Sequence, residues 1–343
     1  MKLRKLTNWA LGALLLANVA CNTSGDEVVL PKGAYENGII IANEGKFNVP
    51  QASVSFATQD LSTVENDVYN KNNNEVLGMQ FQGMGFQGDN AYLILSNSNK
   101  IQVVNRWNFK KEATISNNLA LPRYIAFANS YMYVTNSYPA SVSVFKTSDN
   151  SFVKKINVSN AEHVVEAGSK IFVQNASFGT GKNITIINST SNEVEKIITV
   201  PNGDINKIVS YQGSVYAIAK ETTKSYIYQI STNGDFVRTI TLEGIGNGNN
   251  LVIDQNKFYF TSVNKIYTMD MNSTSAPTTP ILSVVDGGAY MTLYGFNVIN
   301  GKIYTSDVKG FTADSEISVF DTTGKLLKTF TTGIGTNGFY LNK

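Results

Sequence analysis

A strand-rich unit recurs seven times along the chain, and this repeat limits the possible folds more than any other pattern in it. Six of the units carry an aromatic residue at the same place in their second predicted strand, spaced 39–45 residues apart: Tyr92, Tyr133, Phe172, Tyr216, Tyr259 and Tyr304. A four-stranded repeat of roughly 40–45 residues is typical of a propeller blade. Such a unit cannot bury both of its faces alone, so stacking around an axis must supply the core.

Local patterns support an all-β fold. Runs that alternate apolar and polar residues, rich in Val, Ile, Tyr, Phe and Thr, are separated by Asn, Gly, Asp and Ser, and no window keeps a helical period between caps. The first unit, from Gly38, lacks an innermost strand, whereas the chain ends with one, TNGFYLN, at residues 336–342. We therefore expect a seven-bladed β-propeller with four antiparallel strands per blade, in which the C-terminal strand completes the first blade. Two β-sandwich domains are the alternative, but they would need a linker near the middle of the chain.

The N-terminus has the pattern of a secretory signal. Lys2, Arg4 and Lys5 precede a short apolar run, and Cys21, the only cysteine, stands where a bacterial lipobox places its lipidated cysteine. This pattern predicts a signal peptide at residues 1–20, a lipidated Cys21 with a flexible tether at 21–36, and the propeller at 37–343. An ordinary signal peptide with an incidental cysteine is the alternative.

The charge balance argues against nucleic acid as a partner. Without the three basic residues of the signal, 25 basic residues stand against 26 acidic ones, a net charge near −1. A lone His163 without Cys partners cannot form the usual zinc set, and no nucleotide-binding or catalytic motif occurs. We expect no metal and no cofactor.

The start of each innermost strand supplies the best candidate site. One polar residue per blade falls there at the blade spacing: Gln80, Arg123, His163, Asn206, Asn250, Tyr294 and Asn337. In a closed propeller these residues would form a ring at the mouth of the central channel and could hydrogen-bond to a ligand. The alternative is that they bind only channel water or neighbouring backbone.

Four loops between the second and third predicted strands carry aromatic residues: Phe47, Tyr138, Phe178 and Phe311. If the blade assignment holds, these loops share the face that bears the polar ring. Aromatic side chains there suit a planar or amphipathic ligand or a partner protein, although packing between neighbouring loops is the alternative. Glu44, Glu162 and Asp204 are expected near the same face, together with Lys46, Lys182 and Lys220.

The segment from Tyr133 to Val158, with YVTNS, SVSVFKT and VKKINV, resembles the YVTN-type propeller repeat of secreted and surface proteins. The opening GIIIANEGKFNVPQASVSFA, followed by LGMQFQGMGFQGDNAYLILSNSNKIQVVN, resembles the YncE-like lipoprotein propellers of Bacteroidota. Among these it is similar to the surface propellers that bind cobalamin and cap a TonB-dependent transporter.

Three functions follow as hypotheses. The resemblance implies a surface-exposed lipoprotein of the outer membrane that binds a small ligand, cobalamin or another corrinoid, without catalysis and passes it to a TonB-dependent transporter. The second hypothesis is a propeller that binds a protein or glycan through its aromatic loops. The third is a lyase or lactonase that uses His163 with Glu162 or Glu44, which would require these side chains to converge.

Overall fold

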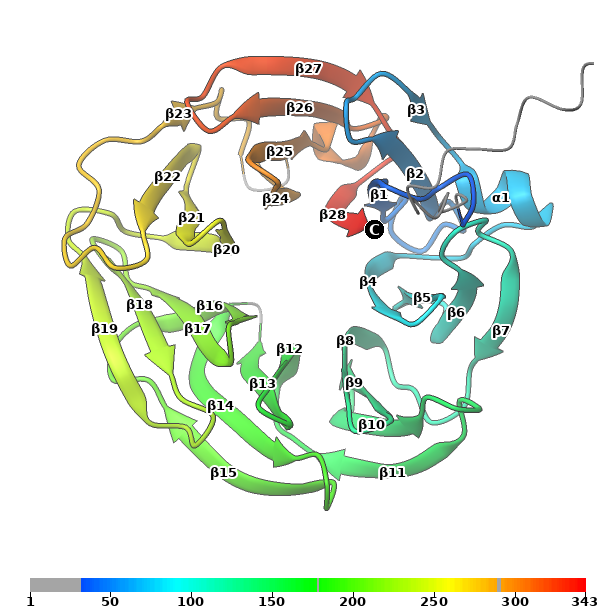
Figure 1. Ribbon diagram of the computed structural model, residues 1–343, viewed down its shortest axis with the longest axis horizontal. Helices are drawn as coiled ribbons and strands as arrows, with labels where there is room; N and C mark the ends of the chain where they lie inside the picture. Colours follow the sequence, from blue (N-terminus) through cyan, green and yellow to red (C-terminus); the bar gives the residue numbers. More distant parts are fainter. Residues whose placement is uncertain (1–31, 178, 289–290) are drawn as a thin grey trace, which may run out of the picture. The chain divides into compact units, whose positions relative to one another are not determined.

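The computed structural model describes residues 32–177, 179–288 and 291–343. Cys21 and the predicted signal peptide lie outside these ranges, as does Phe178. Residues Gly33–Lys343 form one compact unit. Its strands make seven four-stranded antiparallel sheets arranged as blades around a central channel (Figure 1). The seven-bladed prediction is confirmed, and the sandwich alternative is wrong.

In every blade the four strands follow one another from the channel outward. Blade 1 contains β28 (Thr336–Asn342), β1 (Gly38–Asn43), β2 (Ser53–Thr58) and β3 (Val64–Glu65). Blade 2 contains β4 (Phe81–Gln87), β5 (Asn90–Leu95), β6 (Lys100–Asn105) and β7 (Lys111–Ile115). Blade 3 contains β8 (Pro122–Ala128), β9 (Tyr131–Ser137), β10 (Ala140–Lys146) and β11 (Phe152–Asn157). Blade 4 contains β12 (Ala161–Ala167), β13 (Lys170–Ser177), β14 (Thr180–Asn188) and β15 (Glu193–Thr199).

The remaining three blades have the same order. Blade 5 contains β16 (Asp204–Tyr211), β17 (Ser214–Lys220), β18 (Ser225–Ile230) and β19 (Phe236–Leu242). Blade 6 contains β20 (Gly248–Asp254), β21 (Lys257–Ser262), β22 (Lys265–Asp270) and β23 (Leu282–Ser283). Blade 7 contains β24 (Phe296–Ile299), β25 (Lys302–Asp307), β26 (Glu316–Asp321) and β27 (Leu326–Thr331). Two short helices, α1 (Val68–Asn73) and η1 (Lys309–Phe311), interrupt the described strands.

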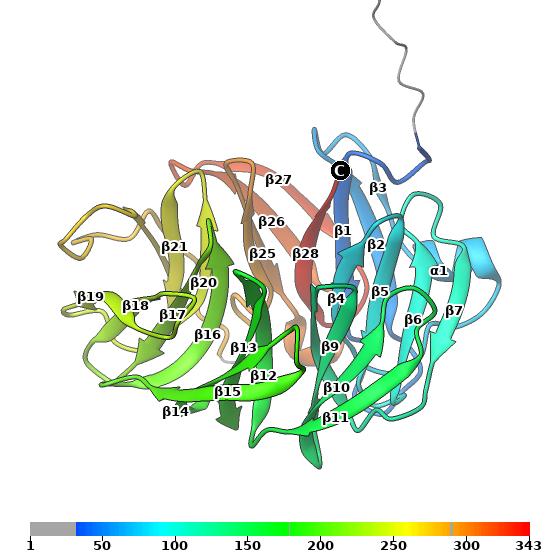
Figure 2. The ribbon, with the colours of Figure 1, turned by 60° about the horizontal axis from the view of Figure 1, so that its bottom comes forward.

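The chain closes the ring as predicted. β28 pairs antiparallel with β1, from Gly38 opposite Asn342 to Asn43 opposite Thr336, so the last strand is the innermost strand of the first blade. Figure 2 shows the C-terminus at one face of the ring, opposite the turn between β9 and β10. The start of each innermost strand therefore lies at the face that carries the loops between second and third strands, called the loop face below.

The core lies between the blades. All six aromatic anchors are buried, and the cluster around Tyr92 of blade 2 includes Val134 and Phe145 of blade 3. Burial of an aromatic side chain of this size stabilises the folded state by roughly 1.5–3 kcal/mol, which explains why one such residue recurs in nearly every blade.

An asparagine that ends the second strand organises the loop face. Asn136 of β9 is fully buried; its Nδ2 donates to Ser143 Oγ on β10 at 3.0 Å, and its Oδ1 accepts from the Ala120 amide at 2.8 Å. Asn43 of β1 makes the corresponding bond to Ser55 Oγ at 2.9 Å. Asn136 joins the hairpin to the segment that enters the innermost strand of its own blade, so the asparagine of the YVTN pattern is structural.

Candidate functional site

The candidate site begins at an irregularity in the innermost strands. In six blades the register between the innermost and second strands shifts near the loop face, for example between Pro122 and Ile125 in β8 and between Ala161 and Val164 in β12. A β-bulge adds a residue to one strand and breaks the alternation of side chains. Two successive side chains in these strands can therefore face the channel.

The first of these positions forms the mouth ring, one residue per blade. Its members are Gln82, Arg123, Glu162, Asn206, Asn249, Tyr294 and Asn337. All seven line one of two cavities at the channel. In four blades the residue directly after the mouth-ring residue is polar and lines the inner of the two cavities. These four side chains form the inner row: Tyr124, His163, Lys207 and Asn250.

Four of the seven predicted ring residues occupy the mouth ring as expected, namely Arg123, Asn206, Tyr294 and Asn337. His163 and Asn250 lie one position deeper, in the inner row, where Glu162 and Asn249 precede them. Gln80 has a left-handed φ of 55° before β4 and lines neither cavity, so the ring residue of blade 2 is Gln82.

A simple regularity in the sequence would have found these positions. Each mouth-ring residue from blade 2 to blade 7 stands ten positions before the aromatic anchor of its blade. Because the bulge has a constant place relative to the anchor, this count gives Gln82 from Tyr92 and Glu162 from Phe172.

The two cavities form a continuous entrance. The outer cavity, of about 800 Å³, is lined by loop-face residues that include Leu121, Tyr138 and Asn160. The inner cavity, of about 390 Å³, is lined mainly by polar residues, and Met84, Ile125 and Phe296 contribute apolar surface to it. Both cavities share His163, Asn206 and Tyr294, so a ligand that enters from the loop face passes the exposed Tyr138 before it reaches the mainly polar lining of the inner cavity.

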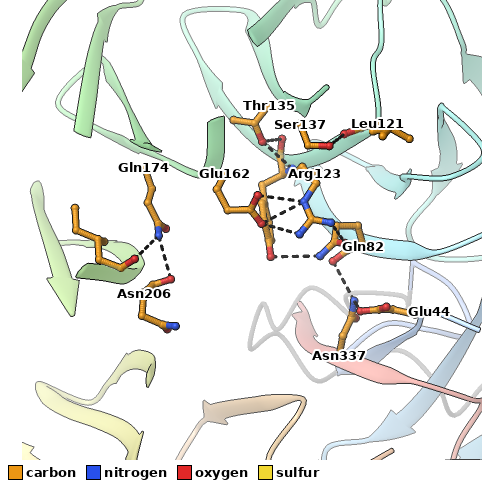
Figure 3. A network of polar contacts seen from close by, with 12 residues as sticks. Glu44, Gln82, Leu121, Arg123, Thr135, Ser137, Glu162, Gln174, Asn206 and Asn337 are labelled. Carbon is orange, nitrogen blue, oxygen red and sulfur yellow. Dashed lines mark hydrogen bonds and ion pairs between the residues drawn. The ribbon is translucent and has the colours of Figure 1, made fainter. Parts of the chain in front are cut away.

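An ion pair dominates one side of the mouth ring (Figure 3). Arg123 Nη2 lies 2.7 Å from Glu162 Oε1, its Nε donates to both oxygens at 3.2 Å, and its Nη1 donates to Gln82 Oε1. Each side chain of the pair keeps about a quarter of its surface exposed, 24% and 22%. The pair joins blades 3 and 4, Gln82 extends the contact to blade 2, and the two charges neutralise each other at the channel.

Glu44 faces this pair from the other side of the ring. Its Oε1 accepts from Tyr294 Oη at 3.0 Å and from Asn337 Nδ2 at 2.8 Å, and Glu44 is only 6% exposed. Burial raises the pKa of Glu44, while the two hydrogen bonds and the nearby Arg123 partly oppose that shift. Burial and Glu44 together raise the pKa of Tyr294.

The inner row brings an aromatic pair next to a cation. The rings of Tyr124 and His163 have centroids 3.9 Å apart and are tilted by 33°. Burial lowers the pKa of His163 well below its ordinary value, and the positive charges of Lys207 and Arg123 lower it further. His163 is therefore neutral at pH 7, and it makes no hydrogen bond or ion pair with Glu162 or Glu44 among the described residues.

The aromatic loop residues differ in their surroundings. Phe47 is 72% exposed and Tyr138 is 80% exposed. Tyr138 lines the outer cavity, whereas Phe47 lines neither cavity. Phe311 instead packs edge-on against Tyr294, the mouth-ring residue of its own blade, with centroids 5.2 Å apart. Phe178 lies outside the described residues.

The other charged residues expected at this face divide between two places. Asp204, Lys182 and Lys220 line a separate cavity of about 360 Å³ between blades 4 and 5. Lys46 is exposed in the loop after β1. Within the described residues no cluster of His, Cys, Asp and Glu could hold a metal ion, and no helix there is long and apolar enough to cross a membrane.

Comparison with solved structures shows the propeller fold. A quinonprotein alcohol dehydrogenase-like protein from Bacteroides thetaiotaomicron superposes with a TM-score of 0.72 at 13% identity, covering 90% of this chain and 79% of the other. A functionally unknown protein from Desulfotomaculum acetoxidans gives a TM-score of 0.63 at 11% identity, with coverages of 89% and 98%. Hydrazine synthase from Kuenenia stuttgartiensis gives 0.58 at 14% identity, with coverages of 73% and 86%.

No curated protein shows significant similarity to this sequence. A family model, described as a domain of unknown function, matches residues 37–340 and so spans all seven blades. The chain belongs to this family, DUF5074.

Proposed function

We propose that this protein is a non-catalytic binding protein that takes a small ligand through the loop face into the channel. The observation that carries the proposal is the pair of contiguous cavities, which share His163, Asn206 and Tyr294 and are lined by the mouth ring and the inner row. A concave site in which a few polar groups converge beside apolar and aromatic side chains is the usual form of a small-molecule site.

The polar groups at this entrance are preorganised. Arg123 is held by Glu162 and Gln82, and Tyr294 is held between Phe311 and Glu44. Groups that are already ordered lose little conformational entropy when a ligand binds. Neither nearby carboxylate hydrogen-bonds to His163, so the imidazole lacks the orienting partner that histidine bases have in catalytic triads, which favours binding over acid–base catalysis.

We further propose, from the sequence resemblance, that the protein is an outer-membrane lipoprotein exposed at the cell surface and that its ligand is a corrinoid such as cobalamin, passed to a TonB-dependent transporter. The lipobox pattern around Cys21 supports the anchor. The outer cavity and the exposed Tyr138 support a ligand with a large, partly apolar surface, of which the inner cavity would take one part.

The general proposal is tested by crystals of Gly33–Lys343 soaked with a library of small polar fragments. This segment forms one compact unit with a closed ring, so we expect it to fold by itself. Fragments should occupy the inner and outer cavities in preference to other surface sites. Density confined to other sites would contradict the proposal.

The corrinoid proposal is tested by equilibrium dialysis of the same segment against cyanocobalamin. Tyr138→Ser should lower the affinity because it removes an exposed aromatic surface from the outer cavity. Val237→Ser is a matched control: this residue is 60% exposed on the outermost strand β19, far from the channel, and its change should leave the affinity unaltered. If cyanocobalamin distributes equally across the membrane, the corrinoid identity is wrong while the channel remains open to other ligands.

A further inference from the structure

Lys207 is the one charged residue of the inner row, and its ammonium group has no partner in the part of the chain that the structure describes. It lines the inner cavity directly after Asn206 of the mouth ring. None of the ion pairs among the described residues includes it, and no side-chain hydrogen bond is made by its Nζ. Arg123, the other cation of the channel, is neutralised by Glu162.

The carboxylates nearby are occupied by other groups. Glu162 binds Arg123, and Glu44 accepts from Tyr294 and Asn337. Burial alone lowers the pKa of Lys207, to about 8, and no neighbouring negative charge opposes that shift. An ammonium group without a counter-ion in such a place costs free energy of folding. The inner cavity therefore holds an ammonium group that no ion pair among the described residues neutralises, and the Glu44 carboxylate lines the same cavity.

The groups around Lys207 describe the rest of a ligand. Asn206 offers its Nδ2 as a hydrogen-bond donor, whereas Asn250 Nδ2 already donates to Thr261 and Leu293, and the paired rings of Tyr124 and His163 form an aromatic wall. Met84, Ile125 and Phe296 add apolar surface to the lining of the same cavity. This environment suits a compact apolar or aromatic body that carries one charged group.

We propose that the inner cavity binds a small organic monoanion, a carboxylate that pairs with Lys207 while its apolar body contacts the Tyr124–His163 wall. The inference rests on the proposed binding function, independently of the corrinoid identity, and specifies the chemistry of a ligand for the inner cavity. A single negative charge matches the single ammonium that has no ion pair, whereas a dianion such as a phosphate monoester would leave its second charge without a counter-ion. The carboxylate can belong to a small ligand that occupies only the inner cavity, or it can be one substituent of a larger ligand.

The test uses benzoate and benzamide, which have nearly the same shape and differ in charge. Calorimetric titration of Gly33–Lys343 with each probe at pH 7 should show a preference for benzoate of about tenfold or more, the range expected for a hydrogen bond to a charged group. Lys207→Met should abolish that preference, and Lys207→Arg should retain most of it because the charge remains. Lys182→Met, at the separate cavity between blades 4 and 5, is the matched control and should change nothing.

The outcomes separate this inference from the function on which it rests. Equal affinity of the wild-type protein for the two probes, or a benzoate preference that survives Lys207→Met, would overturn the carboxylate site and leave the binding function standing. Failure of both probes to bind at millimolar concentration also overturns it, and the fragment soaks then decide whether the channel binds any small ligand.

Discussion

Arg123 of β8 and Glu162 of β12 meet across the junction of blades 3 and 4, with Nη2 and Oε1 separated by 2.7 Å. The two residues are ten positions before the buried anchors Tyr133 and Phe172, so the same geometry of each blade brings them to the same height in the channel. The pair fixes the direction of the guanidinium at the entrance to both cavities.

Removal of the acidic partner should destabilise the protein. Glu162→Gln leaves the Arg123 charge poorly compensated, and we expect a loss of about 1–3 kcal/mol, between the values for exposed and buried pairs because the side chains are partly exposed. Urea denaturation measures this loss. The double variant Arg123→Met/Glu162→Met should recover part of the stability. A double variant that is less stable than Glu162→Gln would show that the pair acts through packing and not through charge.

Lys207→Met should have the opposite effect on stability. The pKa of Lys207 is about 8 in the folded protein and near 10.4 in the unfolded chain, so the unfolded state binds more protons between these values. The contribution of Lys207 to the free energy of unfolding is therefore lowest below pH 8. It rises as the pH increases from the pKa of the folded state to that of the unfolded state. At pH 7 the variant should be more stable than the wild type by about 1–3 kcal/mol.

Denaturation at pH 7 and at pH 10 checks this prediction, since the advantage of the variant should shrink at the higher pH. Arg123, Glu162, Glu44 and His163 also face this region, and comparison of the variant with the wild type at each pH cancels their contributions. An advantage that does not depend on pH would mean that Lys207 is not a buried charge. In parallel, the affinity of the wild-type protein for benzoate should fall as the pH rises above about 8.

Asn136→Ala should destabilise the loop face. The change leaves the Ala120 amide without its acceptor and Ser143 without a donor, in a fully buried place, and should cost about 2–3 kcal/mol. Thermal unfolding measures the loss. Asn97→Ala is the control, because its hydrogen bond to Asn48 is exposed and should contribute little. Similar unfolding temperatures for the two variants would contradict a structural role for Asn136.

Closure of the ring by β28 should be essential for folding. Termination after Gly335 removes the partner of β1, the mouth-ring residue Asn337 and the buried Phe339. The exposed edge and the lost core should abolish cooperative unfolding, which near-ultraviolet circular dichroism follows. Removal of Lys343 alone is the control and should preserve the native spectrum. A cooperative transition in the truncated chain would show that six complete blades suffice.

The architecture could be predicted from the amino-acid sequence alone. Burial of one face of each strand imposes a local alternation, and stacking of equivalent blades imposes the recurrence of Tyr133 and its counterparts, so both are visible along the chain. The same periodicity placed Arg123, Asn206, Tyr294 and Asn337 at the channel mouth. These features depend on residues within one blade.

Which side chains meet in the channel could be known only from the folded ring. The bulge that turns both Glu162 and His163 toward the channel depends on pairing between strands. A prediction from the spacing of ring residues along the chain therefore chose His163 and missed Glu162. The Arg123–Glu162 pair joins neighbouring blades, and Glu44 reaches residues more than 200 positions away in the chain. That Lys207 has no partner among the described residues is likewise a property of the closed ring, because a charge is unpaired only in relation to all the groups that fold around it.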